Sequence, residues 1–165
     1  MTEPLIRPYR PSDASALWQA IGPAIRAGET YALPRDMGEA EALSWWAGGD
    51  HQAFVFERDG EVLGSYFIRP NQLGGGSHVA NAGYATRPES RGQGIARALC
   101  EHSQEQAAAQ GFRLMQFNFV ISSNVGAVTL WQRCGFSIAG TVPEAFSHPR
   151  LGYVDAHIMV KRLSS

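Results

Sequence analysis

Arg91-Gly92-Gln93-Gly94-Ile95-Ala96 is the stretch that decides the fold, because it joins a strand-like segment to a helix-like one through two glycines. Glycine lets the backbone approach a ligand closely and take up left-handed conformations at little cost. The helix that follows directs free N–H groups and the positive end of its dipole at whatever binds there. The stretch therefore predicts a cradle for an anion such as a phosphate.

Composition and charge indicate which kind of protein carries this cradle. The chain has 165 residues, of which 44% are hydrophobic and 18% charged, and such values are typical of a soluble globular protein. We expect a single domain over residues 1–165. Its formal net charge of -1 gives no general attraction for nucleic acid or for an anionic membrane. An anionic ligand must therefore be held by a local site.

Other features of the whole chain argue against a membrane span, a signal region and a metal site. No apolar run approaches the ~20 residues that cross a bilayer, and no signal-like region begins the chain. We expect a cytoplasmic protein with no membrane partner. Cys100 and Cys134 have no CxxC spacing and the histidines form no HxxxH or HxH pair, so we expect two packed thiols and no metal site.

Hydrophobic periodicity and turn residues predict the element order β-α-α-β-β-β-α-β-α-β-β. The predicted strands cover residues 5–9, 52–58, 61–69, 78–86, 113–120, 136–142 and 153–160, and the predicted helices cover 14–21, 39–47, 94–110 and 126–134. The strand, helix, strand unit around the glycine motif implies a parallel pair inside an otherwise antiparallel sheet. The predicted fold class is therefore α/β or α+β, with a mixed sheet flanked by helices. The polar stretch 28–38 and the helix after it are expected to form one wall of a pocket.

This order, together with the glycine motif, resembles the GCN5-related N-acetyltransferase (GNAT) superfamily. The signature there is Arg or Gln, two variable residues, Gly, one variable residue, then Gly or Ala, and Arg91, Gly94 and Ala96 occupy the specified places. Asn124 and the later run Leu130-Trp131-Gln132-Arg133-Cys134-Gly135-Phe136 resemble the family's Asn, Leu-Tyr, Gly-Phe run. The resemblance implies a twisted, mostly antiparallel sheet whose central parallel strands splay apart to admit acetyl-coenzyme A (acetyl-CoA).

The resemblance also implies which residues hold this cosubstrate. Backbone amides in the glycine motif would bind the pyrophosphate, and three consecutive strand residues match positions whose backbone contacts the acetyl-pantetheine end. Asn124 is alternatively a simple helix N-cap, and Trp131 alternatively core packing. Gly83, just before the three strand residues, is consistent with a β-bulge or a close backbone approach, or alternatively with a simple bend, and we expect the bulge. The expected cofactor-binding residues are Tyr84, Ala85, Thr86, Arg91, Gly92, Gln93, Gly94, Ile95, Ala96, Arg97, Asn124 and Trp131.

Two asparagines in the predicted central strands, Asn81 and Asn118, carry the acceptor prediction. Asn is depleted in strand interiors, and a buried amide without partners costs ~1–3 kcal/mol. Either a ligand or internal pairing, with each other or with nearby backbone, explains them. Their surroundings resemble a narrower branch, fungal acetyltransferases that act on the proline analogue azetidine-2-carboxylate. That resemblance implies that both residues contribute to substrate binding and catalysis.

The chain departs from the common catalytic pattern in two places. Trp131 stands where many relatives have a Tyr general acid, and an indole N–H is not a useful proton source at pH 7. The central strand segments also hold no Asp or Glu to act as a base, which leaves a water relay or an amine that arrives partly neutral. Tyr31, His78 and Asp155 are weaker candidates for substrate contact.

The sequence thus predicts an acetyl-CoA-dependent N-acetyltransferase in which a small amino-acid-like amine attacks directly in a ternary complex. The expected partner is a small-molecule amine acceptor, without nucleic acid, and a homodimer is possible. The alternatives are a protein or peptide N-terminal acetyltransferase and a noncatalytic domain that binds acyl-CoA as a sensor.

Overall fold

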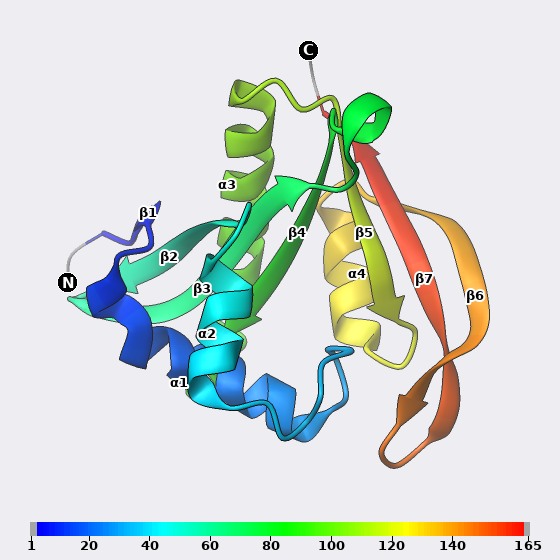
Figure 1. Ribbon diagram of the computed structural model, residues 1–165, viewed down its shortest axis with the longest axis horizontal. Helices are drawn as coiled ribbons and strands as arrows, with labels where there is room; N and C mark the ends of the chain where they lie inside the picture. Colours follow the sequence, from blue (N-terminus) through cyan, green and yellow to red (C-terminus); the bar gives the residue numbers. More distant parts are fainter. Residues whose placement is uncertain (1–2, 164–165) are drawn as a thin grey trace.

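A seven-stranded sheet in the order β1-β2-β3-β4-β5-β7-β6 forms the centre of the protein in a computed structural model that describes residues 3–163 (Figure 1). Only β4 and β5 run parallel, and every other neighbouring pair is antiparallel. The predicted fold class is therefore confirmed. The strands are β1 (Leu5–Pro8), β2 (Gln52–Arg58), β3 (Glu61–Pro70), β4 (Val79–Thr86), β5 (Leu114–Ile121), β6 (Ser137–His148) and β7 (Gly152–Arg162).

Four α-helices connect and cover the strands in the predicted order. They are α1 (Ala14–Ala27), α2 (Glu39–Ala47), α3 (Ile95–Ala109) and α4 (Val125–Arg133). The predicted end of the first helix at residue 21 is wrong, because α1 continues through Pro23. Leu17, Ile21 and Ile25 are all buried at a spacing of four residues, so the apolar face runs past the proline, which lies on the exposed face. None of the helices in this described part of the chain is long and apolar enough to cross a membrane.

The two faces of the sheet bury separate cores. Tyr66 and Phe67 are neighbours in β3, so their side chains point to opposite faces. Tyr66 belongs to a core that contains Leu99 of α3, and Phe67 belongs to a core that contains Trp46 of α2. One face therefore packs against α3 and the other against α1 and α2.

The parallel pair comes apart after two rungs. β4 and β5 pair only at Val79 with Leu114 and at Ala80 with Met115, and Figure 1 shows the two strands diverging from there. The register of β5 against β7 also shifts between Phe117 and Val120. The splayed central pair predicted from the resemblance is thus present.

The predicted bulge at Gly83 is wrong. β3 and β4 stay in continuous register through the pair Phe67 and Gly83. A Cβ atom at Gly83 would lie 2.4 Å from Cε2 of Phe67, so glycine is required here because the Phe67 ring lies directly over the strand. Close packing of a side chain, rather than a bulge, explains this glycine.

The β6–β7 hairpin reaches back to the loop between α1 and α2. Arg150 at its turn donates from Nε to Glu29 Oε1 at 3.0 Å. Glu144 has a φ of 53° and lies where the register of β6 slips against β7. Asp155 Oδ1 accepts a hydrogen bond from the Glu144 backbone N–H at 3.0 Å, so this carboxylate stabilises the irregular hairpin.

Candidate functional site

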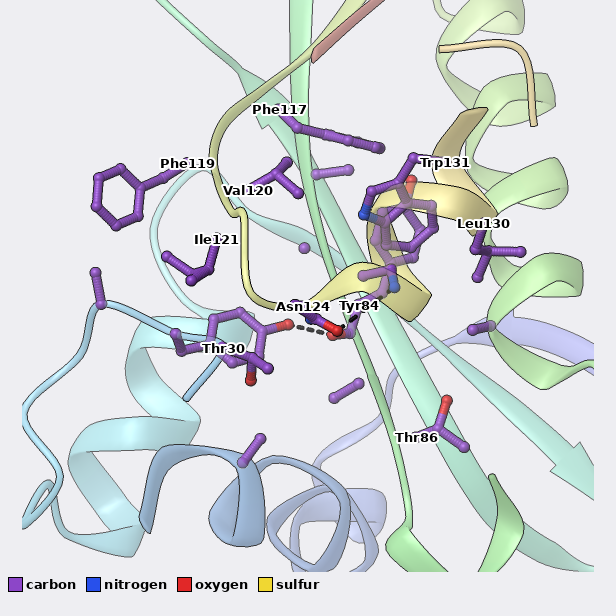
Figure 2. Close-up of a pocket in the computed structure, with 18 of the residues that line it drawn as sticks. Thr30, Tyr84, Thr86, Phe117, Phe119, Val120, Ile121, Asn124, Leu130 and Trp131 are labelled. Carbon is purple, nitrogen blue, oxygen red and sulfur yellow. Dashed lines mark hydrogen bonds between the residues drawn. The ribbon is translucent and has the colours of Figure 1, made fainter. Parts of the chain in front are cut away.

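A cavity of about 560 Å³ lies where β4 and β5 part. Because its walls include residues from both cores, it passes through the sheet from the face covered by α3 to the face covered by α1 and α2. Figure 2 shows Trp131 of α4 beside this opening, and Phe117 and Phe119 on opposite sides of β5. The lining includes Thr30, Tyr31, Leu33, Trp45, Phe67, Asn81, Ala82, Tyr84, Ala85, Thr86, Arg91, Ala96, Phe117, Asn118, Phe119, Val120, Ile121, Asn124, Leu130 and Trp131.

The predicted anion cradle stands at one end of this cavity. Gly92 and Gly94 have φ values of 78° and 80°, which is the left-handed conformation that glycine adopts without strain. α3 begins at Ile95, so the N–H groups of its first turn have no carbonyl partner within the helix. Arg91 and Ala96 line the cavity itself. The cradle therefore borders the cavity with Arg91 and with N–H groups that have no partner within the helix.

The edge of β4 presents backbone groups to the gap. The Val79 carbonyl accepts from the Asn71 N–H on the β3 side, and the Arg87 N–H donates to the Leu63 carbonyl on the same side. Backbone groups of successive strand residues alternate in direction, so those of Ala82 and Tyr84 face β5. β5 is no longer paired with β4 at that level, so these groups have no ladder partner in β5.

Tyr31, from the loop between α1 and α2, makes a direct contact with this edge. Its hydroxyl donates a hydrogen bond to the Tyr84 carbonyl. Burial raises the pKa of the Tyr31 phenol well above its ordinary value, so the group stays protonated at neutral pH. The carbonyl can only accept, and the lone pairs of the Tyr31 oxygen remain free.

Trp131 forms an aromatic wall with two strand residues. Its ring centroid lies 4.9 Å from that of Tyr84 and 5.2 Å from that of Phe117. The Tyr84 hydroxyl points away into the core, where its oxygen lies 2.6 Å from Ser103 Oγ, and burial raises its pKa. Trp131 therefore both packs and lines the cavity, and Tyr84 meets the gap with its backbone.

Asn81 and Asn118 lie in the cavity wall without bonding each other. Asn81 Nδ2 donates to the Gln116 carbonyl at 3.0 Å, and the Gln116 side chain donates to Asn118 Oδ1 at 3.0 Å. Asn118 Nδ2 donates to Asn71 Oδ1 at 2.7 Å. Since the Asn81 amide nitrogen is engaged by a carbonyl, its Oδ1 is the atom left to accept a hydrogen bond. Asn118 has both of its amide groups in protein contacts.

Aromatic side chains surround the cavity on the α1 and α2 face. Trp45 and Trp46 lie edge-on to Phe67, with ring centroids 5.5 Å and 5.0 Å away. His51 stacks on Phe67 at 4.2 Å and 7°, and burial lowers its pKa, so the imidazole is neutral at pH 7. The predicted pocket wall from residues 28–38 and the next helix is thus present, since Tyr31, Leu33 and Trp45 line the cavity.

Asn124 combines a capping role with a position in the cavity wall. It is the N-cap of α4, where its side chain accepts from the Ala127 N–H at 3.4 Å, and it lines the cavity. His78, by contrast, lies in an exposed turn before β4 and is absent from the cavity lining. Asp155 is engaged in the β6–β7 hairpin. Neither is included in the site proposed below.

The ionisable side chains of the described lining are Arg91, Tyr31 and Tyr84. No carboxylate or imidazole lines the cavity within residues 3–163, and no group of three His, Cys, Asp or Glu side chains there comes together as a metal site would require. Phe67 and Phe119 also line the cavity, and Asn71 bonds to Asn118 in its wall, although no motif in the sequence marks any of these three residues.

Comparison with known proteins identifies the family. The pattern of the acetyltransferase (GNAT) family matches residues 18–136. N-acetyltransferase aca1 of Schizosaccharomyces pombe is 38% identical over 101 residues, which are 59% of this chain and 47% of the yeast protein. Mycothiol acetyltransferase of Streptomyces avermitilis is 27% identical over 135 residues, 80% of this chain and 42% of that protein. The chain spans less than half the length of these two curated relatives.

Solved structures agree with this match. A GCN5-related N-acetyltransferase from Kribbella flavida is 40% identical, with a TM-score of 0.91 over 97% of this chain and 98% of that one. YncA of Salmonella typhimurium, a putative acetyltransferase solved with its cofactor acetyl-CoA, shares the fold at a TM-score of 0.84 and 19% identity, over 99% of this chain and 96% of that one. These findings confirm the resemblance drawn from the two motifs. The chain belongs to the acetyltransferase (GNAT) family.

Proposed function

We propose that this protein transfers the acetyl group of acetyl-CoA to the nitrogen of a small amino-acid-like amine. The observation that carries the proposal is the cavity that passes through the sheet, with an anion cradle at one end and aromatic side chains with uncharged polar groups at the other. Two substrates entering from opposite faces would meet at the exposed edge of β4. Direct attack of the amine on the thioester proceeds without a covalent enzyme intermediate, so the two substrates must meet in this way.

The residues at the cradle end of the cavity fit acetyl-CoA. The pyrophosphate would lie on the amides of Gly92 to Arg97 with Arg91 beside it, since glycines at positive φ and the start of α3 provide N–H groups without side-chain obstruction. The pantetheine arm would follow the backbone of Tyr84 and Thr86 along the unpaired edge of β4, with Asn124 and Trp131 as the opposite wall. Bound acetyl-CoA supplies the acetyl group as an activated thioester.

The residues at the aromatic end of the cavity suit a small nitrogen nucleophile. The Asn81 amide nitrogen and the Tyr31 hydroxyl already donate to backbone carbonyls, so Asn81 Oδ1 and the Tyr31 oxygen would act as acceptors for the N–H groups of an amine. Trp45, Phe67 and Phe119 give an apolar surface for a compact ring or short side chain. The whole cavity measures about 560 Å³, and the acetyl-pantetheine end must share it, which supports a small acceptor over a protein chain.

The chemistry would rest on positioning and polarisation. Backbone N–H groups at the β4 edge are placed to stabilise charge that develops on the attacked carbonyl oxygen. Since the described lining holds no carboxylate or imidazole, the attacking nitrogen would arrive neutral or lose its proton to water. The departing thiol has a pKa of ~8.5 and needs no side-chain acid to leave at neutral pH.

Thiol release from acetyl-CoA in the presence of an amine panel tests the proposal. The panel should contain proline-like cyclic amino acids, linear amino acids, polyamines and peptides with a free N-terminus. We expect turnover with the small amino acids and little with peptides. Preferred turnover of peptides would support the N-terminal acetyltransferase alternative, and tight acetyl-CoA binding without any turnover would support the sensor alternative.

A further inference from the structure

An arginine from a distant strand reaches the anion cradle. Arg58 is the last residue of β2, and its Nη2 donates to the side-chain Oε1 of Gln93 at 2.5 Å. Gln93 lies between Gly92 and Gly94, the two glycines whose left-handed backbone forms the cradle. The guanidinium of Arg58 is therefore held one side chain away from the N–H groups that face the ligand.

The charge of Arg58 is not neutralised by the contact that holds it. Within residues 3–163 none of the ion pairs includes Arg58, whereas Arg97 at the same cradle pairs with Glu101 at 3.0 Å. Gln93 is an uncharged amide, so it fixes the guanidinium without cancelling its field. The cradle thus has two arginines with no paired carboxylate, Arg91 on its rim and Arg58 behind it.

We propose that Arg58 is a cofactor-selecting residue, whose positive charge favours donors that carry the CoA pyrophosphate over shorter pantetheine donors. Gln93 is its positioning residue. The inference rests on the cradle as the pyrophosphate site, assigned under the proposed function. A charge held by a partly hydrated loop acts over several ångströms and weakens as salt screens it. Its contribution is therefore selective for the phosphates and sensitive to ionic strength.

Equilibrium binding to the full chain tests this without any acceptor. The ligands are CoA, dephospho-CoA, which keeps the pyrophosphate, and pantetheine, which has no phosphate; binding is followed by calorimetry at low and high salt. For Arg58→Ala we expect about fivefold weaker binding of CoA and of dephospho-CoA, the size of effect of one charge several ångströms away. Pantetheine binding should stay unchanged, and Arg58→Lys should keep most of the wild-type affinity.

Two further variants distinguish an effect of the Arg58 charge from a structural effect on the glycine loop. Arg113→Ala removes the same charge beyond the other end of α3, where the side chain is exposed, and should not change CoA binding. Gln93→Ala should weaken CoA binding less than Arg58→Ala, because the guanidinium remains present. An equal loss for CoA and pantetheine in Arg58→Ala would mean that the residue only supports the loop, and would overturn the inference.

The remaining outcomes are also decisive. Loss with CoA but not with dephospho-CoA would show that Arg58 acts on the 3′-phosphate and would reject its assignment to the pyrophosphate. Unchanged CoA affinity in Arg58→Ala would reject the role altogether. A wild-type protein that binds CoA no more tightly than pantetheine would reject the cradle itself as the pyrophosphate site, a failure that is visible without any variant.

Discussion

The side-chain amide of Asn81 bonds to the backbone carbonyl of Gln116, with Nδ2 3.0 Å from the oxygen, on the rung that follows the last paired residues of β4 and β5. Ala80 and Met115 still pair through the parallel ladder. On the next rung a side chain replaces the backbone donor. Asn81 thereby satisfies the first free carbonyl of β5 and fixes where the two strands separate.

Replacing Asn81 by Ala should therefore impair stability and catalysis together. The Gln116 carbonyl would lose its donor in a partly buried position, which costs about 1–3 kcal/mol of unfolding free energy. The start of the gap would also be less well defined, and the acceptor would lose Oδ1. We expect kcat with an amine to fall at least tenfold while the KM for acetyl-CoA changes little, measured beside urea unfolding.

Asn118→Ala is the matched control for that change. Its side chain is exposed, and its hydrogen bonds within residues 3–163 are to the side chains of Asn71 and Gln116. We expect a stability change within about 0.5 kcal/mol, as at other surface positions. A loss of stability equal to that of Asn81→Ala would contradict the special place of Asn81 at the end of the ladder.

Trp131 provides a second prediction, because it stands where relatives have a proton-donating tyrosine. The ring packs on Tyr84 and Phe117, and an indole N–H does not act as an acid at pH 7. Trp131→Phe should therefore keep kcat within about threefold, while Trp131→Ala opens a cavity and should cost about 2–4 kcal/mol of stability. Steady-state kinetics and thermal unfolding of both variants provide the check. A loss of kcat above tenfold in Trp131→Phe would assign the indole a chemical role.

The sequence predicted those parts of the fold that depend on local patterns. Alternating apolar residues and the glycine motif depend only on residues close to them in the sequence, and the element order derived from them is confirmed. The positive φ angles of Gly92 and Gly94 follow from the same motif. Two motifs in the correct order were enough to predict the family.

The remaining features depend on contacts between distant residues. Gly83 is required by the Phe67 ring of the neighbouring strand, and no local pattern shows which ring lies over a glycine. α1 passes through Pro23 because its apolar face continues against the sheet. The bond from Asn81 to Gln116 depends on the register of a parallel pair that is joined only through α3.

The pH dependence of the reaction should follow the acceptor, which is the third prediction. No carboxylate or imidazole lines the cavity among the described residues, and burial raises the pKa of Tyr31, which keeps its proton through pH 6–9. We expect kcat/KM to rise tenfold per pH unit and to level off at the pKa of the amine. Two acceptors whose amine pKa values differ by about 2 should shift the plateau by that amount. A plateau at one pH for both would reveal a base in the protein.

His51 gives a fourth prediction, on stability. Burial lowers the pKa of this imidazole below its ordinary 6.5, where it stacks on Phe67 and its Nδ1 lies 3.1 Å from the Trp46 carbonyl. The unfolded chain then binds a proton at a higher pH than the folded chain does. The stability that comes from keeping His51 neutral is fully present above pH 6.5. It is lost as the pH falls through the lower pKa that His51 has in the folded chain. Thermal unfolding from pH 8 to 5 should show a smaller decline for His51→Gln than for the wild type. A decline as steep as the wild type's would mean that His51 does not titrate differently on folding.

Gly83→Ala tests how closely the Phe67 ring packs on β4. The added Cβ would lie 2.4 Å from Cε2 of Phe67, so the ring must move, and His51 and Trp45 are packed against it. Overpacking of this kind costs about 1–3 kcal/mol, and the displaced ring should also weaken acceptor binding more than acetyl-CoA binding. Gly75→Ala, where nothing lies within 4 Å of the new atom, is the matched control and should leave both stability and kinetics unchanged. If Gly83→Ala behaved like Gly75→Ala, the Phe67 ring would be free to shift, and its packing on β4 could not be the reason for glycine at position 83.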